Sequence, residues 1–413
     1  MVSRSTVAAF AALAIIALQV ASKIARDTLF LANAGVETLS YAMCTAAVVS
    51  VVLAFMTANW ARARSPLELL VVGLATNAVL FLTEGAVLAR APVATSWLLF
   101  IHVSAFGPVI ASAFWLHLAD AIRGPDAPRT FASVSSGATL GGVCGGILAE
   151  RVTSVFSFER LLLMLAAGAV TLAVGAFVAH RRSAPDDVEP SDPEVSTSSA
   201  VALVAERPYL RKLALLLALT AIATSIGDFV MKTSVAGVIQ DATSLVAFFS
   251  LFHTLTGVLS FALQTTATRS LIERIGVRGT LALLPLSFGL LAGAGALLGR
   301  VLVAVLLRGT DAVLTNSVFR SSYELLYTGI PRDVVRSTKP VIDVVFFRLG
   351  DVVGSAFVAL TMLAAPTLGI TWLLAAAVLV SAVAAFLARS VGASYEHAAA
   401  TEKAFLTARA QPA

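Results

Sequence analysis

Long apolar runs alternate with short polar breaks along almost the whole chain. A bilayer hydrocarbon core about 30 Å thick is crossed by about 20 helical residues, and the runs have that length. Hydrophobic residues make up 58% of the sequence and charged residues 13%, which excludes a soluble protein. We therefore expect an all-α membrane protein with about twelve transmembrane helices, at residues 5–32, 38–58, 67–89, 95–122, 130–149, 158–179, 209–237, 243–267, 279–298, 301–328, 339–363 and 367–388.

A polar segment divides these spans into two groups of six. Residues 181–208 are rich in proline, acidic residues, serine and threonine, so they bury too little apolar surface to offset the entropy cost of ordering. The pattern predicts a six-helix bundle at 1–180, a mobile cytoplasmic linker at 181–208, a second six-helix bundle at 209–390 and a cytoplasmic tail at 391–413.

The loop charges predict the orientation. Most loop lysines and arginines fall in one set of alternate loops, and the other set holds only Arg90, Arg151, Arg160 and Arg300. Because short basic loops prefer the cytoplasm, we expect both termini and the linker there, in a multi-pass protein of a bacterial inner membrane. The net charge of +5 is then a topological bias, and it gives no reason to expect a nucleic-acid partner.

Six basic residues lie inside apolar runs, and most have acidic neighbours. A charge at membrane depth costs several kcal/mol, so it normally faces a polar cavity and has a partner. Several such charges of mixed sign indicate a polar pathway and hence a transporter. The six residues are Lys23, Arg26, Lys232, Arg308, Arg320 and Arg348.

The charged positions of the two halves also correspond. Lys23, Arg26 and Asp27 follow the start of the first helix by about the same distance as Asp228 and Lys232 follow the start of the seventh, which places them at matching depth. Two parallel six-helix repeats with a substrate site between them are typical of the major facilitator fold. We expect these residues to bind an anionic substrate; the alternative is purely structural pairing of Arg26 with Asp27 or Asp228, and of Lys232 with Asp228.

Other embedded charges have acidic neighbours three or four residues away, which can neutralise them locally. We expect structural or gating pairs there rather than direct ligands. These pairs are Arg308 with Asp311, Arg320 with Glu324, and Arg348 with Asp351.

Several single residues have an ordinary interpretation. Glu84 is a candidate for a protonatable coupling group, but we rather expect a carboxylate at a helix end near the headgroups. His102 could titrate at physiological pH, but we rather expect it to face a neighbouring hydroxyl. For Asn77 and Asn316, a role as polar pore residues and an ordinary structural role are equally good interpretations. We expect Cys44 and Cys144 to be buried without forming a disulfide or metal site. The glycine-rich run at 137–146 lies in an apolar span and follows no strand, so it predicts close helix packing rather than a phosphate loop.

The sequence has no Walker, HExxH or GxSxG motif and no recognisable nucleophile–base arrangement. We expect no enzymatic activity, no catalytic residue, no cofactor and no metal.

Two motif groups resemble a known family. Asp228-Phe-Val-Met-Lys232 precedes a phenylalanine-rich helix, and Glu324-Leu-Leu-Tyr327 precedes Lys339-Pro-Val-Ile-Asp343 at a fixed distance. With Lys23-Ile-Ala-Arg26-Asp27-Thr-Leu in the first half, these motifs resemble the ATP/ADP translocases of plastids and obligate intracellular bacteria, over about residues 10–390.

The resemblance implies a major-facilitator-like exchanger of nucleotides with phosphate-binding basic residues and acidic residues that assist coupling. It implies substrate-binding roles for Lys23, Arg26, Asp228, Lys232 and Lys339, and a coupling role for Asp343. Together with the local pairs, the expected coupling or gating residues are Asp27, Asp343, Arg320, Glu324, Arg348 and Asp351. Two positions depart from the family pattern: residues 102–107 contain no acidic residue, and Asp351 stands where a basic residue is usual.

These observations favour a monomeric secondary transporter in the lipid bilayer. It would exchange an anionic, phosphorylated metabolite such as a nucleotide through alternating access. Two alternatives remain open: a proton-coupled exporter of an amphipathic small molecule, and a membrane scaffold or sensor that does not transport.

Overall fold

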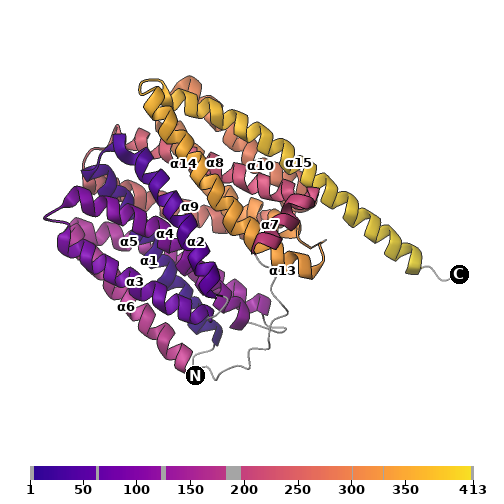
Figure 1. Ribbon diagram of the computed structural model, residues 1–413, viewed down its shortest axis with the longest axis horizontal. Helices are drawn as coiled ribbons and strands as arrows, with labels where there is room; N and C mark the ends of the chain where they lie inside the picture. The colour runs from indigo at the N-terminus through magenta and orange to yellow at the C-terminus, as the bar shows by residue number, and fades with distance from the viewer. Residues whose placement is uncertain are drawn as a thin grey trace. The chain divides into compact units, whose positions relative to one another are not determined.

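The computed structural model describes residues 4–61, 65–121, 127–182, 197–299, 301–328 and 330–410. Every regular element in these ranges is a helix. The chain forms two compact units: unit 1 comprises Met1–Pro190 with Ala236–Val258, and unit 2 comprises Ser191–Val235 with Leu259–Ala413. The predicted all-α class is confirmed (Figure 1).

Unit 1 is built from six long helices and the first part of a seventh. Its first three helices are α1 (Arg4–Asn33), α2 (Leu39–Ala61) and α3 (Pro66–Val87). They are followed by α4 (Pro92–Ala121), α5 (Ala127–Val155) and α6 (Phe158–Arg182). Most of α9 (Ala242–Thr266) also belongs to unit 1.

Unit 2 holds the remaining helices. The regular ones are α7 (Thr197–Glu206), α8 (Pro208–Ala236), α10 (Thr268–Leu298) and α15 (Gly369–Ala410). Two other expected spans are interrupted by π-helical turns. The first consists of α11 (Val301–Leu314), η2 (Thr315–Phe319) and α12 (Arg320–Leu325). The second consists of α13 (Arg332–Pro340), η3 (Val341–Phe346) and α14 (Phe347–Ala364).

Ten helices of the described ranges are long and apolar enough to cross a membrane. They match ten of the twelve expected spans; the other two correspond to α5 and to the α13–α14 segment. Glycine, serine and threonine make α5 less apolar, and α13–α14 is interrupted by η3 and carries several charges.

Glycines of α5 allow it to pack closely on α1. Gly137, Gly141 and Gly145 lie one turn apart, and a Cβ atom on each would overlap with the α1 backbone at Ala9, Leu13 and Ala17, respectively. The small residues let the two backbones approach, as is typical of helix contacts in lipid. The glycine-rich run is thus a packing surface, as the sequence predicts.

The same contact recurs in unit 2. Gly350 and Gly354 of α14 lie against Ala218 and Ile222 of α8, where a Cβ atom would come within 2.9 Å of their Cα atoms. The contact of α3 with α6 likewise recurs as the contact of α10 with α15, which run side by side in Figure 1. First-with-fifth and third-with-sixth pairings therefore occur in both halves, which confirms the predicted six-helix repeats.

Two segments are more ordered than the sequence predicts. Helix α7 lies within the expected linker and packs on α13, with Ala200 and Val204 fully buried. Helix α15 continues through the expected tail to Ala410. At about 1.5 Å per residue, its 42 residues extend about 63 Å, roughly twice the hydrocarbon thickness. Helix α7 is ordered because its apolar residues pack against α13.

Proline and glycine interrupt two other helices. Pro108 has no N–H for the Ser104 carbonyl one turn earlier in α4, and the Ser50 hydroxyl of α2 donates to that carbonyl at 3.3 Å instead. In α10, Gly276 has a φ of +70°, so the helix is kinked there.

At the start of α9, Asp241 accepts the Ser244 N–H at 2.7 Å, which holds the pKa of this carboxyl below its usual value.

Candidate functional site

Six charged residues of unit 2 form what we call the ion cluster. They come from three helices, and three are carboxylates and three are cations, so the cluster is neutral when all are ionised. Its members are Asp228 and Lys232 of α8, Arg308 and Asp311 of α11, and Arg348 and Asp351 of α14.

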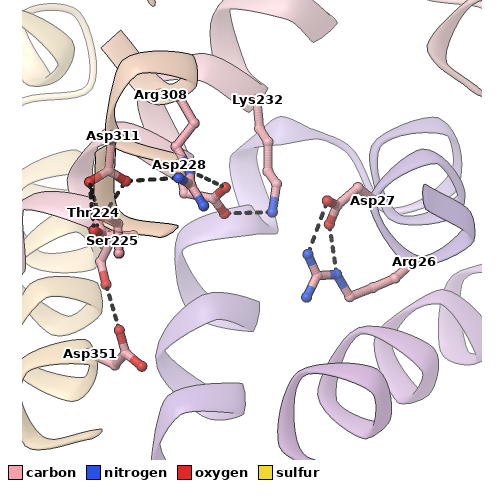
Figure 2. Close-up of polar contacts among 10 residues, drawn as sticks. Arg26, Asp27, Thr224, Ser225, Asp228, Lys232, Arg308, Asp311 and Asp351 are labelled. Carbon is pink, nitrogen blue, oxygen red and sulfur yellow. Dashed lines mark hydrogen bonds and ion pairs between the residues drawn. The ribbon is translucent and has the colours of Figure 1, made fainter. Parts of the chain in front are cut away.

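Asp228 is shared between two cations (Figure 2). Lys232 Nζ lies 2.6 Å from Asp228 Oδ2, and Arg308 Nε lies 3.2 Å from Asp228 Oδ1. The Lys232 side chain is only 2% exposed, whereas that of Asp228 is 24% exposed. The acidic residue is therefore the accessible member of a pair whose cation is buried.

Asp311 is held by several donors. Arg308 Nη1 lies 2.8 Å from its Oδ2, and the Thr224 hydroxyl of α8 donates to both carboxylate oxygens at 3.1–3.2 Å. Asp311 is itself buried, and Arg308 therefore bridges a buried carboxylate and the accessible Asp228. The planar guanidinium, with several N–H donors in fixed directions, suits such a bridge.

Asp351 joins the same face of α8. Arg348 Nη1 lies 2.9 Å from Asp351 Oδ2, and the Ser225 hydroxyl donates to Asp351 Oδ1 at 3.4 Å. Thr224 and Ser225 thus connect neighbouring helices to α8 within unit 2 (Figure 2). Hydroxyl groups scattered along an apolar helix are common, so the sequence alone offered no signal for either residue.

In unit 1, Arg26 and Asp27 form a two-pronged pair. Arg26 Nε and Nη2 donate to the two Asp27 oxygens at 2.7 and 3.0 Å, and Arg26 Nη1 donates to the Ser104 hydroxyl at 3.0 Å. The guanidinium also lies 5.0 Å from the centre of the Phe100 ring. Asp27 is buried, and Arg26 remains partly exposed.

Lys23 precedes this pair by one turn of α1 and is exposed. It lines a small pocket between α1, α3 and α4 with the polar side chains of Gln19, Ser22 and Asn77. The pocket lies entirely within unit 1, and Lys23 is the one basic side chain among its described lining residues.

A further cluster surrounds Lys339 in α13. Lys339 Nζ lies 2.9 Å from Asp343 Oδ2 and 3.2 Å from Glu324 Oε2. The buried Tyr323 hydroxyl donates to Asp343 Oδ1 at 2.6 Å and lies 2.7 Å from the Tyr327 hydroxyl. This places the Glu-x-x-Tyr segment and the following Lys-x-x-x-Asp segment in one network.

The remaining predicted gating residue is peripheral to this network. Arg320 Nε lies 3.8 Å from Glu324 Oε1, and the Arg320 side chain is 69% exposed. A long, exposed contact of this kind contributes little. Lys23 and Arg26 belong to unit 1, and the other predicted binding residues belong to unit 2.

The structure corrects the sequence interpretation of Glu84 and His102. Glu84 lies in the last turn of α3, as expected, but it is only 1% exposed; His102 is 3% exposed and faces a carboxylate and an amide rather than a hydroxyl. His102 Nδ1 lies 2.9 Å from Glu84 Oε1, and His102 Nε2 lies 2.6 Å from Asn77 Oδ1. Sequence reasoning missed this network because its members come from two helices.

The two cysteines and the potential metal ligands are the remaining candidate residues. Cys44 and Cys144 are both free; neither is buried as expected, since Cys44 is half-buried and Cys144 is exposed. In the part of the chain that the structure describes, no three His, Cys, Asp or Glu side chains are arranged to hold a metal ion.

No protein-family model matches the chain, and no curated protein sequence matches it. Solved structures do match over nearly the full length. A mutant of the nucleoside transporter NupG is 13% identical, with a TM-score of 0.66 over 93% of this chain and 98% of that one. An inward-facing, unoccupied bacterial homologue of the human lysosomal transporter Spinster is also 13% identical, with a TM-score of 0.63 over 96% and 99%.

A peptide-bound transporter of the POT family is 10% identical, with a TM-score of 0.64 over 92% of this chain and 96% of that one. At these identities the likeness concerns the fold. The helix order, the recurring helix pairs and these matches agree, and the chain is an integral membrane protein with the major facilitator fold.

Proposed function

We propose that the protein is a secondary transporter that exchanges an anionic, phosphorylated metabolite, such as a nucleotide, across the membrane. The observation that carries this proposal is the neutral ion cluster within membrane-spanning helices of unit 2. Keeping six charged groups at membrane depth is costly even when they are paired. A purely structural helix contact could be made by small apolar residues, as α1 and α5 do.

The cluster suits an anion that competes with a carboxylate. Asp228 is the exposed partner of Arg308 and Lys232, and a phosphate can replace it because phosphate oxygens accept the same charge-assisted hydrogen bonds. The carboxylate would hold the cations when no substrate is bound, and the substrate would release it. Such an exchange of partners links substrate binding to a change of state.

Unit 1 contributes a second basic element to the proposal. Lys23 is exposed in its pocket and Arg26 is partly exposed beside Ser104. We assign both to phosphate binding, with Asp27 as the carboxylate that holds Arg26 between cycles.

The Lys339 network and the Arg348–Asp351 pair are proposed as gates. Lys339 contacts two carboxylates from different helical segments, Glu324 and Asp343, and it lies beside the π-helical turn η3. Such turns often occur at functional sites. Lys339 would bind substrate when these contacts open, while Arg320 would assist only through Glu324.

The substrate class rests on two kinds of similarity. The motifs around Asp228, Glu324 and Lys339 resemble the ATP/ADP translocases, which exchange nucleotides. One of the structures with the same fold is a nucleoside transporter. We extend to this chain the part these proteins share, a nucleoside moiety, and the basic residues account for added phosphate.

We also propose the membrane topology. Residues 1–180 and 209–390 form the two halves of a monomer in a bacterial inner membrane, and the linker 181–208 and the tail 391–413 lie in the cytoplasm. The asymmetry of loop arginines and lysines supports this orientation. Single cysteines introduced at loop positions of an otherwise cysteine-free variant, and labelled from either side of the membrane, would test this orientation.

Transport into proteoliposomes tests the function directly. Labelled ATP should enter vesicles loaded with unlabelled ADP or ATP, and entry into empty vesicles should be much slower. Lys232→Ala and Arg26→Ala should lose this exchange, while the exposed Arg160→Ala control should retain it. If no phosphorylated compound enters under any loading, the proposal is wrong. Uptake that requires a pH gradient and ignores internal nucleotide would instead support the proton-coupled exporter.

A further inference from the structure

A buried polar network connects α3 and α4 within unit 1. It consists of Asn77 and Glu84 of α3 and His102 of α4, all at most 6% exposed. The rings of Phe81 and Phe106 lie 4.9 and 5.7 Å from the His102 ring, between ring centres. Polar groups in such apolar surroundings need a complete set of hydrogen-bond partners.

The hydrogen-bond geometry determines how many protons the network holds. Asn77 presents its carbonyl oxygen to His102 Nε2 at 2.6 Å, so Nε2 must carry a hydrogen. Glu84 Oε1 and His102 Nδ1 are 2.9 Å apart, and two bare acceptors would repel at that distance, so one further proton lies between them. Glu84 and His102 are therefore neutral together, either as two neutral groups or as an ion pair.

The network can release one proton without losing a hydrogen bond. When the Nε2 proton leaves, His102 keeps Nδ1–H and donates it to the Glu84 carboxylate. The Asn77 amide can then turn by half a rotation, so that its NH₂ group donates to the bare Nε2. The two states differ by one proton, and the network changes from neutral to singly negative.

A path for this proton begins at Asn77, because Asn77 also lines the pocket that contains Lys23, Gln19 and Ser22. The network therefore borders a polar pocket at Asn77, while the buried Glu84 Oε2 has no hydrogen-bond partner within the described part of the chain. A carboxylate with one unpartnered buried oxygen favours the neutral, proton-loaded state.

Few other charged groups face the network. From α1 these are Lys23 in the shared pocket and the Arg26–Asp27 pair. Residues Leu39–Ala61 of α2 contain no charged residue or histidine, and α6 brings Glu159 and Arg160 at its first turn, where the Glu159 backbone lies beside Gly85. Lys23 is the cation that would stabilise the negative state through the pocket.

We propose that Asn77, His102 and Glu84 form a proton-binding site that couples proton movement to transport by this protein. The coupling part rests on the proposed transport function, whereas the proton binding does not. The site takes one proton, which enters and leaves through the Lys23 pocket as His102 Nε2 gains and loses its hydrogen.

The proton binding can be tested on the purified protein without any substrate. The chain contains five histidines, so ¹⁵N-histidine labelling gives few signals, and His102→Gln identifies those of His102. We expect Nε2 of His102 to lose its hydrogen in a one-proton step as the pH is raised. His102 signals that stay unchanged over the whole pH range in which the protein remains folded would overturn the site.

Two conservative variants sharpen this test. Glu84→Gln can only offer a neutral partner, so the His102 step should shift or disappear. Asn77→Asp replaces an amide that can either donate or accept by a carboxylate that only accepts. His102 should therefore keep both ring hydrogens to higher pH. The control Glu159→Gln, on the helix packed against α3, should leave the step unchanged. A His102 step that Glu84→Gln and Asn77→Asp both leave in place would contradict the assignment.

Transport in proteoliposomes tests the coupling. If each exchange cycle moves one net proton, an imposed gradient of one pH unit should change the ratio of the exchanged nucleotides across the membrane by about tenfold. Glu84→Gln should remove this dependence and Glu159→Gln should not. Labelled ATP uptake that ignores the pH gradient would overturn the coupling. If no phosphorylated compound moves at all, the proposed function fails, while the histidine titration still decides whether the proton site exists.

Discussion

Lys232 and Asp228 lie one turn apart on α8, with Lys232 Nζ 2.6 Å from Asp228 Oδ2. The lysine is among the largest fully buried side chains of the described residues, yet its carboxylate partner remains partly exposed and also contacts Arg308. The pair therefore combines a buried charge with an accessible counterion. Under the proposed function, an anion from solution would compete with this accessible carboxylate for the two cations.

Removing one member of this pair should be more harmful than removing both. Asp228→Asn leaves the Lys232 ammonium buried without a carboxylate, and breaking such a pair costs about 3–5 kcal/mol. We expect a clear fall in melting temperature in detergent for Asp228→Asn and for Lys232→Met. The double variant should melt closer to the wild type than either single variant.

The exposed Asp241 provides the matched control for that series. Asp241→Asn removes a carboxylate that only caps the start of α9, so its effect should stay within about 1 kcal/mol. Equal destabilisation by Asp228→Asn and Asp241→Asn would show that the ion cluster has no special energetic role.

Arg308→Lys should disconnect the ion cluster although the charge is kept. Arg308 reaches Asp228 through Nε and Asp311 through Nη1, and a lysine offers a single point of contact instead of this fork. We expect nucleotide exchange to fall by at least about tenfold, equivalent to about 1.4 kcal/mol, with the protein still folded. Exchange rates equal to those of the wild type would mean that the bridge is dispensable.

Alanine substitutions at two neighbouring glycines of α5 should change the stability of the protein in opposite directions. A methyl group at Gly141 would overlap with the Leu13 backbone of α1, whereas one at Gly142 meets nothing within 4 Å. We expect Gly141→Ala to destabilise the protein by about 1–3 kcal/mol through overpacking. Gly142→Ala should be neutral or stabilising by up to about 1 kcal/mol. Thermal unfolding in one detergent compares the two, and similar melting temperatures would contradict the close α1–α5 contact.

Tyr323→Phe should weaken the Lys339 network. It removes the hydroxyl that donates to Asp343 and deprives the Tyr327 hydroxyl of a partner, which costs about 1–2 kcal/mol. Asp343 keeps Lys339, so the fold should survive and the exchange rate should change. Tyr395→Phe is the control, because the Tyr395 hydroxyl makes an exposed hydrogen bond with Thr328 outside the Lys339 network. An unchanged exchange rate in Tyr323→Phe would remove this network from the proposed gates.

The apolar runs of the sequence predicted the positions of most helices. The first, seventh and eighth expected spans agree with α1, α8 and α9 to about one residue at each end, because each is a continuous run with polar limits. The interruptions η2 and η3 could not be predicted in the same way, since neither contains a proline or glycine that would mark a break in the helix. The order of α7 also depended on the α13 surface that it covers.

The sequence by itself determined the solvent and the class of the protein, because length and hydropathy alone decide whether a helix can span lipid. It also determined the local ion pairs, such as Asp228 with Lys232, since residues four apart share a helix face. Only the tertiary structure decided which pairs join across helices: Arg308 with Asp228, Thr224 with Asp311, and His102 with Glu84. Such contacts depend on the angle and depth at which helices pack, and the residue pattern along one chain does not specify either quantity.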